Sequence, residues 1–331
     1  MIPAFFGLAG TVLGEAERAL FRSADPAGYI LFARNVESPE QLRALTASLT
    51  DLAGRDLPIL IDQEGGRVAR LRPPHWPEFP SGAVFDALYR RAPVTAIEAC
   101  RLNALALATM LRELGITVDC LPLLDVRDNG GHDIIGDRAL GAEPMQVAAL
   151  GRATLDGLRQ GGVCGVVKHI PGHGRAAADS HLELPVVEAS LEALERDFEP
   201  FRRLAAAPMA MTAHVTYTAL DPDNCATLSP RVIEFIRNDI GFSGLLMSDD
   251  LGMKALSGDF GARARAALAA GCDIALHCSG EMAEMEAIAA ALDPISQAGR
   301  RRLDAAMAWA GGGDKTPMTR WAEARDRLLA V

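Results

Sequence analysis

The chain has 331 residues, of which 49% are hydrophobic and 23% charged, so it can build a substantial core, and this composition excludes a disordered protein. Its formal net charge of −10 repels phosphate backbones and anionic lipid headgroups, which argues against nucleic-acid and membrane-surface binding. The six cysteines include no Cys-x-x-Cys pair and lie mostly in apolar runs, which is typical of free thiols in a reducing compartment.

The N-terminal segment enters an apolar run without the basic region of a signal peptide. No apolar stretch is expected to approach the roughly 20 residues that span a bilayer. We therefore expect a cytoplasmic protein.

Short apolar runs alternate along the chain with segments of helical period. Eight runs are nearly continuously apolar, as in parallel strands buried on both faces. The predicted strands, in chain order, are Ala4–Ala9, Gly28–Phe32, Pro58–Ile61, Ile116–Leu121, Val163–His169, Ala210–His214, Gly244–Met247 and Asp273–Cys278. The predicted helices between them include Pro39–Leu52, Val94–Leu114, Pro144–Gln160, Ser190–Ala206, Ser229–Asp239 and Gly261–Ala270. Ser38 and Ser229 each precede a proline, the pattern of an N-cap followed by proline at the first helical position.

This alternation predicts a parallel sheet with right-handed crossovers. Eight such units fit an α/β fold of one (β/α)₈ TIM-type barrel, although an open doubly wound sheet has the same local pattern. No low-complexity linker interrupts the chain, so we expect a single domain over residues 1–331. Long loops are expected at about 67–93, 128–143 and 170–185, and a glycine run at 311–313 precedes a short C-terminal helix.

Polar residues end four of the apolar runs, which is the main chemical signal. They are Asp62, the pair Lys168 and His169, His214, and the pair Asp249 and Asp250. The C-terminal strand ends of a (β/α)₈ barrel face its active site, so we expect these groups to share one pocket. The role of His214 stays open.

Two further residues suit proton transfer. Asp179 and His181 are two positions apart in the predicted loop after Lys168 and His169. A carboxylate beside an imidazole fixes its tautomer and stabilises its protonated form, and histidine titrates near neutral pH. An incidental surface ion pair is the alternative.

The adjacent acids at the seventh predicted strand end allow several chemistries. Asp249 can act as a nucleophile, while Asp250 fits the N-cap of a helix starting near Met253, and a Mg²⁺ site is an alternative for the pair. The cluster from Asp62 to Arg70 suits hydroxyl-rich ligands, because carboxylates accept and guanidinium groups donate hydrogen bonds.

Taken together, these segments resemble glycoside hydrolase family 3, in its single-domain bacterial β-N-acetylhexosaminidase branch. The matching motifs occur in the family's order. They are Ile61–Val68 (IDQEGGRV), Pro122–Val126 (PLLDV), Lys168–Gly174 (KHIPGHG), Asp179–His181 (DSH) and Phe242–Met253 (FSGLLMSDDLGM).

The resemblance implies a retaining enzyme that hydrolyses terminal β-linked N-acetylglucosamine through a covalent glycosyl-enzyme. Asp249 would be the nucleophile and His181 the acid/base, with Asp179 as its partner. The positions implied to hold the sugar are Asp62, Arg70, Arg138, Lys168 and His169. The implied substrate is a saccharide or muropeptide, such as an N-acetylglucosaminyl-1,6-anhydro-N-acetylmuramyl peptide in peptidoglycan recycling. We expect a monomer without cofactor or metal.

Three other functions fit parts of the pattern. Lys168 at a strand end would suit a Schiff-base lyase or aldolase. A metal hydrolase could use His169, His173, His181 or His214, although Pro171 prevents His169 and His173 from sharing a helix face and no H-E-x-x-H motif exists. A non-catalytic sugar-binding barrel would retain Asp62 and Lys168 but not depend on Asp249.

Overall fold

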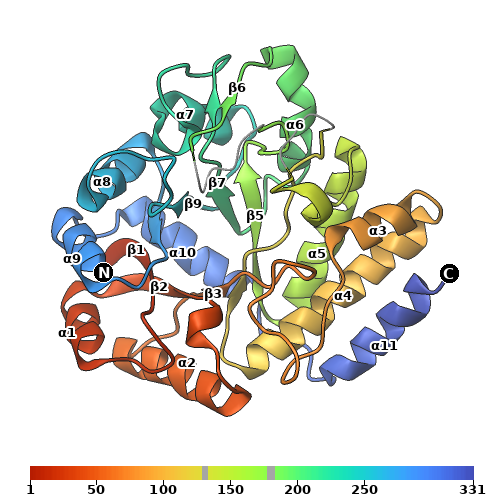
Figure 1. Cartoon of the computed structure of the whole chain (residues 1–331), viewed down its shortest axis with the longest axis horizontal. Coiled ribbons are helices and arrows are strands. Elements are labelled where there is room, and N and C mark those ends of the chain that lie inside the picture. Colours follow the sequence, from red (N-terminus) through yellow and green to blue (C-terminus); the bar gives the residue numbers. More distant parts are fainter. Residues whose placement is uncertain (129–132, 177–182) are drawn as a thin grey trace.

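The computed structural model describes residues 1–128, 133–176 and 183–331, which form a closed barrel of eight parallel strands (Figure 1). The strands are β1 (Ile2–Gly7), β2 (Pro26–Leu31), β3 (Ile59–Ile61), β4 (Val118–Asp119), β5 (Cys164–Ile170), β7 (Met209–Thr212), β9 (Leu245–Asp250) and β10 (Ile274–His277). Each barrel strand pairs with the next along the chain, and β10 pairs with β1 to close the ring. The predicted (β/α)₈ barrel and all eight predicted strands are confirmed, and the open sheet is excluded.

Helices surround the barrel. They are α1 (Glu15–Ala24), α2 (Pro39–Ala53), α3 (Gly82–Tyr89), α4 (Pro93–Glu113), α5 (Pro144–Gly161), α6 (Leu191–Arg203), α7 (Pro230–Asn238), α8 (Phe260–Ala270), α9 (Met282–Ala291), α10 (Gln297–Trp309) and α11 (Met318–Leu329). The six predicted helices are present within a few residues of their expected ends. The side chains of Ser38 and Ser229 accept hydrogen bonds from the backbone N–H groups of Gln41 and Val232, so both predicted N-caps are confirmed.

The structure also differs from the sequence predictions. The expected loop at 67–93 contains α3, whose apolar face packs beside α4. A separate two-stranded sheet joins β6 (Val186–Val187) to β8 (Thr216–Tyr217). Each of these strands has only two residues, which is too short for a recognisable apolar pattern.

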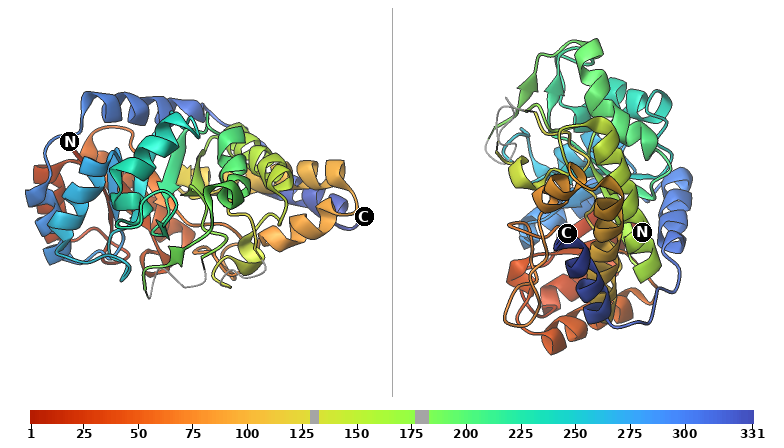
Figure 2. Two further views of the ribbon diagram at one scale, coloured as in Figure 1. Left: turned by 90° about the horizontal axis from the view of Figure 1, so that it is seen from above. Right: turned by 90° about the vertical axis from the view of Figure 1, so that its right-hand side faces the viewer.

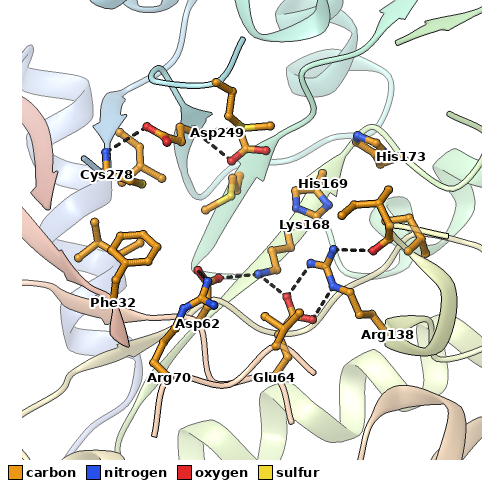
Figure 3. A pocket seen from close by; sticks show the side chains of 18 of the residues that line it. Phe32, Asp62, Glu64, Arg70, Arg138, Lys168, His169, His173, Asp249 and Cys278 are labelled. Atoms are coloured by element: carbon orange, nitrogen blue, oxygen red, sulfur yellow. Dashed lines mark hydrogen bonds and ion pairs between the residues drawn. The ribbon is translucent and has the colours of Figure 1, made fainter. Parts of the chain in front are cut away.

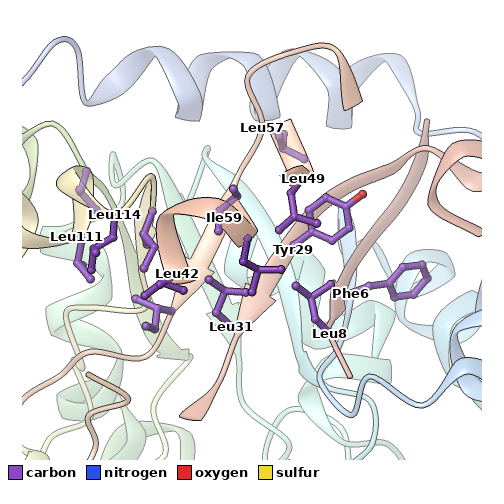
Figure 4. Packing of buried hydrophobic residues seen from close by; sticks show 14 of the residues in the cluster. Phe6, Leu8, Tyr29, Leu31, Leu42, Leu49, Leu57, Ile59, Leu111 and Leu114 are labelled. Carbon is purple, nitrogen blue, oxygen red and sulfur yellow. The ribbon is translucent and has the colours of Figure 1, made fainter. Parts of the chain in front are cut away.

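The hydrophobic core has two layers. Inward-facing side chains such as Phe5, Ile30 and Val166 fill the barrel, together with Leu303 and Ala306 of α10. Outward-facing side chains of β1 to β3 pack against α2 and α4, where Figure 4 shows residues such as Tyr29, Leu42 and Leu111 in one cluster. Helix α10 covers the N-terminal end of the barrel, opposite the loops that follow the strands (Figure 2).

Two irregularities in strand pairing occur at that open end. The register between β5 and β7 shifts between Lys168 and Ile170, and the register between β9 and β10 shifts between Met247 and Asp250. Strict alternation would send neighbouring side chains to opposite faces of the sheet, whereas a bulge redirects one of them. The shifts explain how consecutive residues on each strand both reach the cavity described below.

Helix α4 corrects one expectation from the sequence. It has 21 residues and enough hydrophobic side chains to cross a membrane by length and composition. Most of it is buried against α5, α3 and α11, and Asn103 within it binds Arg325 of α11 at 2.9 Å. Its apolar character therefore reflects its position as a core helix.

Candidate active site

A cavity of about 260 Å³ lies at the C-terminal end of the barrel (Figure 3). The structure brings to its wall six residues that the family resemblance implied, together with the strand-end acid Asp250. The six are Asp62, Arg70, Arg138, Lys168, His169 and Asp249. Apolar side chains complete the wall, among them Phe32, Ile135, Met211 and Met253. Residues from the ends of seven barrel strands, or from the loops that follow them, therefore converge on one site.

Lys168 is the central cation of the cavity. Its Nζ atom lies 2.8 Å from Asp62 Oδ1 and 2.7 Å from Glu64 Oε1, and its side chain is almost fully buried. Burial by itself lowers the pKa of Lys168, but the carboxylates of Asp62 and Glu64 outweigh it and hold this pKa well above its ordinary value. An amine paired with two carboxylates keeps its proton and is a poor nucleophile, so this pairing disfavours the Schiff-base alternative.

Two arginines flank Lys168 and complete a charged cluster. Arg138 forms a bidentate pair with Glu64, with Nε 2.9 Å from Oε2 and Nη2 2.7 Å from Oε1. Arg70 Nη2 donates to Asp62 Oδ2 at 2.9 Å. Burial raises the pKa of Glu64, but Lys168 and Arg138 outweigh this effect and lower it to about 2. The pKa of Asp62 is also held well below its usual range, because Lys168 and Arg70 outweigh its burial.

Glu64 was not among the site residues predicted from the sequence. It follows Asp62 by two positions, and the signal for it was a second acid in the same short motif. Its role depends on Lys168 and Arg138, which are 104 and 74 residues away in the chain. Such pairings are not visible in one sequence.

His169 is held by a second residue that the sequence did not assign. Asp125 is fully buried, and its Oδ2 lies 2.8 Å from His169 Nδ1. Its Oδ1 accepts the backbone N–H groups of His169, at 3.2 Å, and of His173, at 2.7 Å. Burial raises the pKa of Asp125, but the histidines outweigh it and lower this pKa to about 2, so the carboxylate fixes a proton on His169 Nδ1.

Asp249 lies at the end of β9, and its partly exposed carboxylate lines the same cavity as Asp62 and Lys168. Its backbone N–H lies 3.3 Å from Thr212 Oγ1, and its Oδ1 accepts the N–H of Asp250 at 2.8 Å. The convergence expected from the strand ends is therefore present for these residues, but it is wrong for His214, whose ring is fully buried against Thr227 and the Asp250 carbonyl and does not line the cavity.

Asp250 has a different local role from the one expected. Its Oδ1 accepts N–H groups from Gly252, at 2.9 Å, and from Cys278, at 3.0 Å, so it braces the loop after β9 against the end of β10. The expected helix near Met253 is wrong: this segment forms turns, and α8 begins later with Asp259 as its N-cap. Within the described ranges, no group of three or more His, Cys, Asp or Glu side chains is arranged to hold a metal ion.

Asp179 and His181 lie outside the described residues. The part of their loop that the structure describes ends at Ala176. Its residue His173 lines the cavity, so the loop starts at the cavity wall. Burial, with a smaller contribution from His169, lowers the pKa of His173 to about 4, so this imidazole is neutral at pH 7.

This arrangement suits a ligand rich in hydroxyl groups. Charged donors and acceptors alternate around the cavity, and hydrogen bonds to ionised groups are stronger than those between neutral partners. The carboxylate of Asp249 lines the same space.

Comparisons with known proteins agree with this chemistry. Residues 12–308 match the family described as the glycosyl hydrolase family 3 N terminal domain. A β-hexosaminidase of Alkalilimnicola ehrlichii is 40% identical over 98% of this chain and 95% of its own length. A β-hexosaminidase of Thioalkalivibrio sulfidiphilus is 37% identical over 99% of this chain and 96% of its own length.

Solved structures give the same result. NagZ from Neisseria gonorrhoeae in complex with N-trifluoroacetyl-D-glucosamine has a TM-score of 0.88 and 31% identity, covering 99% of this chain and 97% of that one. A glycoside hydrolase family 3 β-N-acetylglucosaminidase from Paenibacillus has a TM-score of 0.85 and 32% identity, covering 98% of this chain and 67% of that one. The chain therefore belongs to glycosyl hydrolase family 3, as a glycoside hydrolase whose relatives are β-hexosaminidases.

Proposed function

We propose that this glycoside hydrolase removes terminal, non-reducing β-linked N-acetylglucosamine with retention of configuration, through a covalent glycosyl-enzyme at Asp249. The observation that supports this most is the position of the Asp249 carboxylate in one cavity with the cluster of Asp62, Glu64, Lys168 and Arg138. A carboxylate held beside a sugar-binding cluster is the arrangement that nucleophilic attack on an anomeric carbon requires.

The charged cluster would hold the sugar. Asp62 and Glu64 stay ionised and accept hydrogen bonds from hydroxyl groups, while Arg70 and Arg138 have guanidinium N–H groups that donate to ring substituents. His169 is fixed by Asp125 with a proton on Nδ1, so the edge of its ring toward the cavity can bind the same ligand. These contacts would place the anomeric carbon near Asp249 before reaction.

The reaction would take two steps. An oxygen of Asp249 attacks the anomeric carbon while His181 donates its proton to the glycosidic oxygen, and the aglycone leaves. His181 then removes a proton from water, which attacks the anomeric carbon and releases Asp249. Asp179 would orient His181 and stabilise its protonated form. Two inversions give net retention.

The proposed substrate is an N-acetylglucosaminyl-1,6-anhydro-N-acetylmuramyl peptide, cleaved in the cytoplasm during peptidoglycan recycling by a monomeric enzyme. The ligand of the related gonococcal NagZ, N-trifluoroacetyl-D-glucosamine, supports recognition of an N-acylated glucosamine. All six cysteines are free thiols, and five of them are buried, which supports a reducing compartment.

Hydrolysis of a chromogenic N-acetyl-β-glucosaminide tests this proposal. The wild-type chain should release the chromophore, and Asp249→Ala should lower kcat by about 10³-fold or more, since no nucleophile remains. Added azide should fill the vacated space in Asp249→Ala and yield an α-glycosyl azide, whose configuration NMR identifies. An Asp249→Ala variant with wild-type turnover would overturn the proposal.

A further inference from the structure

A chain of buried hydroxyl and imidazole groups lies behind Asp249. Thr212 Oγ1 and Thr227 Oγ1 are 2.7 Å apart, and Thr227 Oγ1 is 2.7 Å from His214 Nδ1. His214 Nε2 lies 3.0 Å from the backbone oxygen of Asp250. The three side chains come from the end of β7, from the segment after it, and from the 3₁₀ helix Ala226–Leu228, and all are fully buried. None of the three is among the described residues that line the cavity.

Simple chemistry fixes the direction of these hydrogen bonds. The Asp250 carbonyl only accepts, so the proton of His214 is on Nε2. Burial lowers the pKa of His214 against the opposing effects of Asp249 and Asp250, which favours the neutral ring at pH 7, and Nδ1 of the neutral ring accepts. Thr227 therefore donates to His214, in preference to the Ala213 carbonyl at 3.2 Å. Thr212 in turn donates to Thr227, which leaves a lone pair of Thr212 for the N–H of Asp249.

This chain holds the backbone on both sides of Asp249. Thr212 accepts the N–H of Asp249, and His214 donates to the carbonyl of Asp250. Between them, the N–H of Asp250 donates to Asp249 Oδ1 at 2.8 Å and sets the orientation of its carboxylate. A shift of either flanking peptide would therefore move the carboxylate.

We infer that Thr212, Thr227 and His214 form a positioning network that aims the Asp249 carboxylate at the anomeric carbon, an inference that rests on the proposed role of Asp249. His214 touches no substrate in this account and acts through the Asp250 carbonyl. The network gives His214, which follows β7 but does not line the cavity, a role in the site. A misplacement of a reacting group by about 1 Å can cost about 10²-fold in rate.

Two substitutions of His214 separate its two contacts. Glutamine places an amide N–H near the position of Nε2, so His214→Gln can still donate to the Asp250 carbonyl. Asparagine reaches only the position of Nδ1, so His214→Asn keeps an acceptor for Thr227 but loses the Asp250 contact. With a chromogenic N-acetyl-β-glucosaminide, we expect kcat of His214→Asn to fall about 10²-fold and that of His214→Gln less than about 10-fold. KM should change little in both variants, because the sugar-binding cluster is intact.

A second pair of variants tests the other end of the network. Thr212→Ser keeps the hydroxyl group, whereas Thr212→Val has a similar shape without it. We expect the serine variant to retain most of kcat and the valine variant to lose about 10-fold or more. Thermal unfolding of each variant shows whether it folds. If His214→Asn does not fold, the Thr212 pair still tests the positioning network.

Crystal structures of the variants test the inference without relying on hydrolysis. The Asp249 carboxylate should be displaced in His214→Asn and in Thr212→Val, but not in the matched variants His214→Gln and Thr212→Ser. Equal kcat within each pair, a loss confined to KM, or an undisplaced carboxylate would overturn the network. If instead the wild-type chain fails to hydrolyse the substrate, the proposed function fails, while the crystal structures still decide the positioning role.

Discussion

At the scale of single residues, the site depends on pairs of opposite charges that share a small buried volume. Glu64 receives three contacts from Lys168 and Arg138, so it sets the position of two groups proposed to bind the sugar. Breaking a buried pair leaves an uncompensated charge, which costs far more than an exposed pair would.

Glu64→Gln tests this dependence. The amide would present N–H groups to two cations, so Lys168 and Arg138 should shift and kcat/KM should fall by roughly 10²-fold. Steady-state kinetics on the chromogenic substrate measures the change. Glu78→Gln, an exposed position in the same loop, is the matched control and should behave as wild type. Equal activity of the two variants would contradict the role of Glu64.

The same residue predicts a pH dependence of stability. The pKa of Glu64 is lowered from 4.5 to about 2 in the folded protein, so its ionised form favours folding. This contribution is fully present above the unfolded value of 4.5 and is lost as the pH falls toward 2. Urea unfolding at several pH values should therefore show a smaller loss of stability on acidification in Glu64→Gln than in the wild type. Parallel losses would show that Glu64 is not the responsible group.

His181 predicts a dependence on the leaving group. A general acid matters most when the departing oxygen is basic, so His181→Ala should lose far more activity on alkyl than on nitrophenyl N-acetyl-β-glucosaminides. Measuring kcat/KM over a series of aglycones gives this slope. An equal loss for every aglycone would contradict the acid role of His181 and leave that of Asp249 standing.

At the scale of elements, the residues of the candidate active site lie at the C-terminal end of the barrel, and helix α10 covers its N-terminal end. Leu303 of α10 is buried against the barrel interior and lies at the end opposite the cavity. Stability and catalysis are therefore separated along the barrel axis.

Leu303→Ala should separate these two properties. Removing a buried leucine leaves a cavity and costs about 2–5 kcal/mol of unfolding free energy. Because the substrate cavity is remote, KM and kcat should stay close to wild-type values at temperatures where the variant is folded. Denaturant unfolding and kinetics measure the two effects, and Arg301→Ala, exposed on the same helix, is the control. A strong effect on KM would contradict this separation.

The elements also show what one sequence can predict. The eight barrel strands were identifiable because strands buried on both faces form continuous apolar runs. The two-residue strands β6 and β8 had no such pattern. The acids Glu64 and Asp125 were missed as site residues because their partners are distant in the chain, and Asp250 braces a loop where a helix was expected. The polar residues at the strand ends were enough to predict the position of the site. Most ion pairs within the site join residues that are distant in the chain, so they could be identified only in the structure.

At the scale of the whole molecule, the barrel gathers distant residues at one opening. Asp62 and Asp249 are separated by most of the chain, yet both line a cavity of about 260 Å³. In the proposed reaction, the terminal sugar of the substrate would occupy this cavity.

The most direct measurement is mass spectrometry of the chain after incubation with a slow fluorinated N-acetylglucosaminide. A covalent sugar should be found on the peptide that contains Asp249, and Asp249→Asn should show none. A sugar attached to another residue, or continued hydrolysis of the fluorinated compound without any adduct in rapidly quenched samples, would contradict the proposed mechanism.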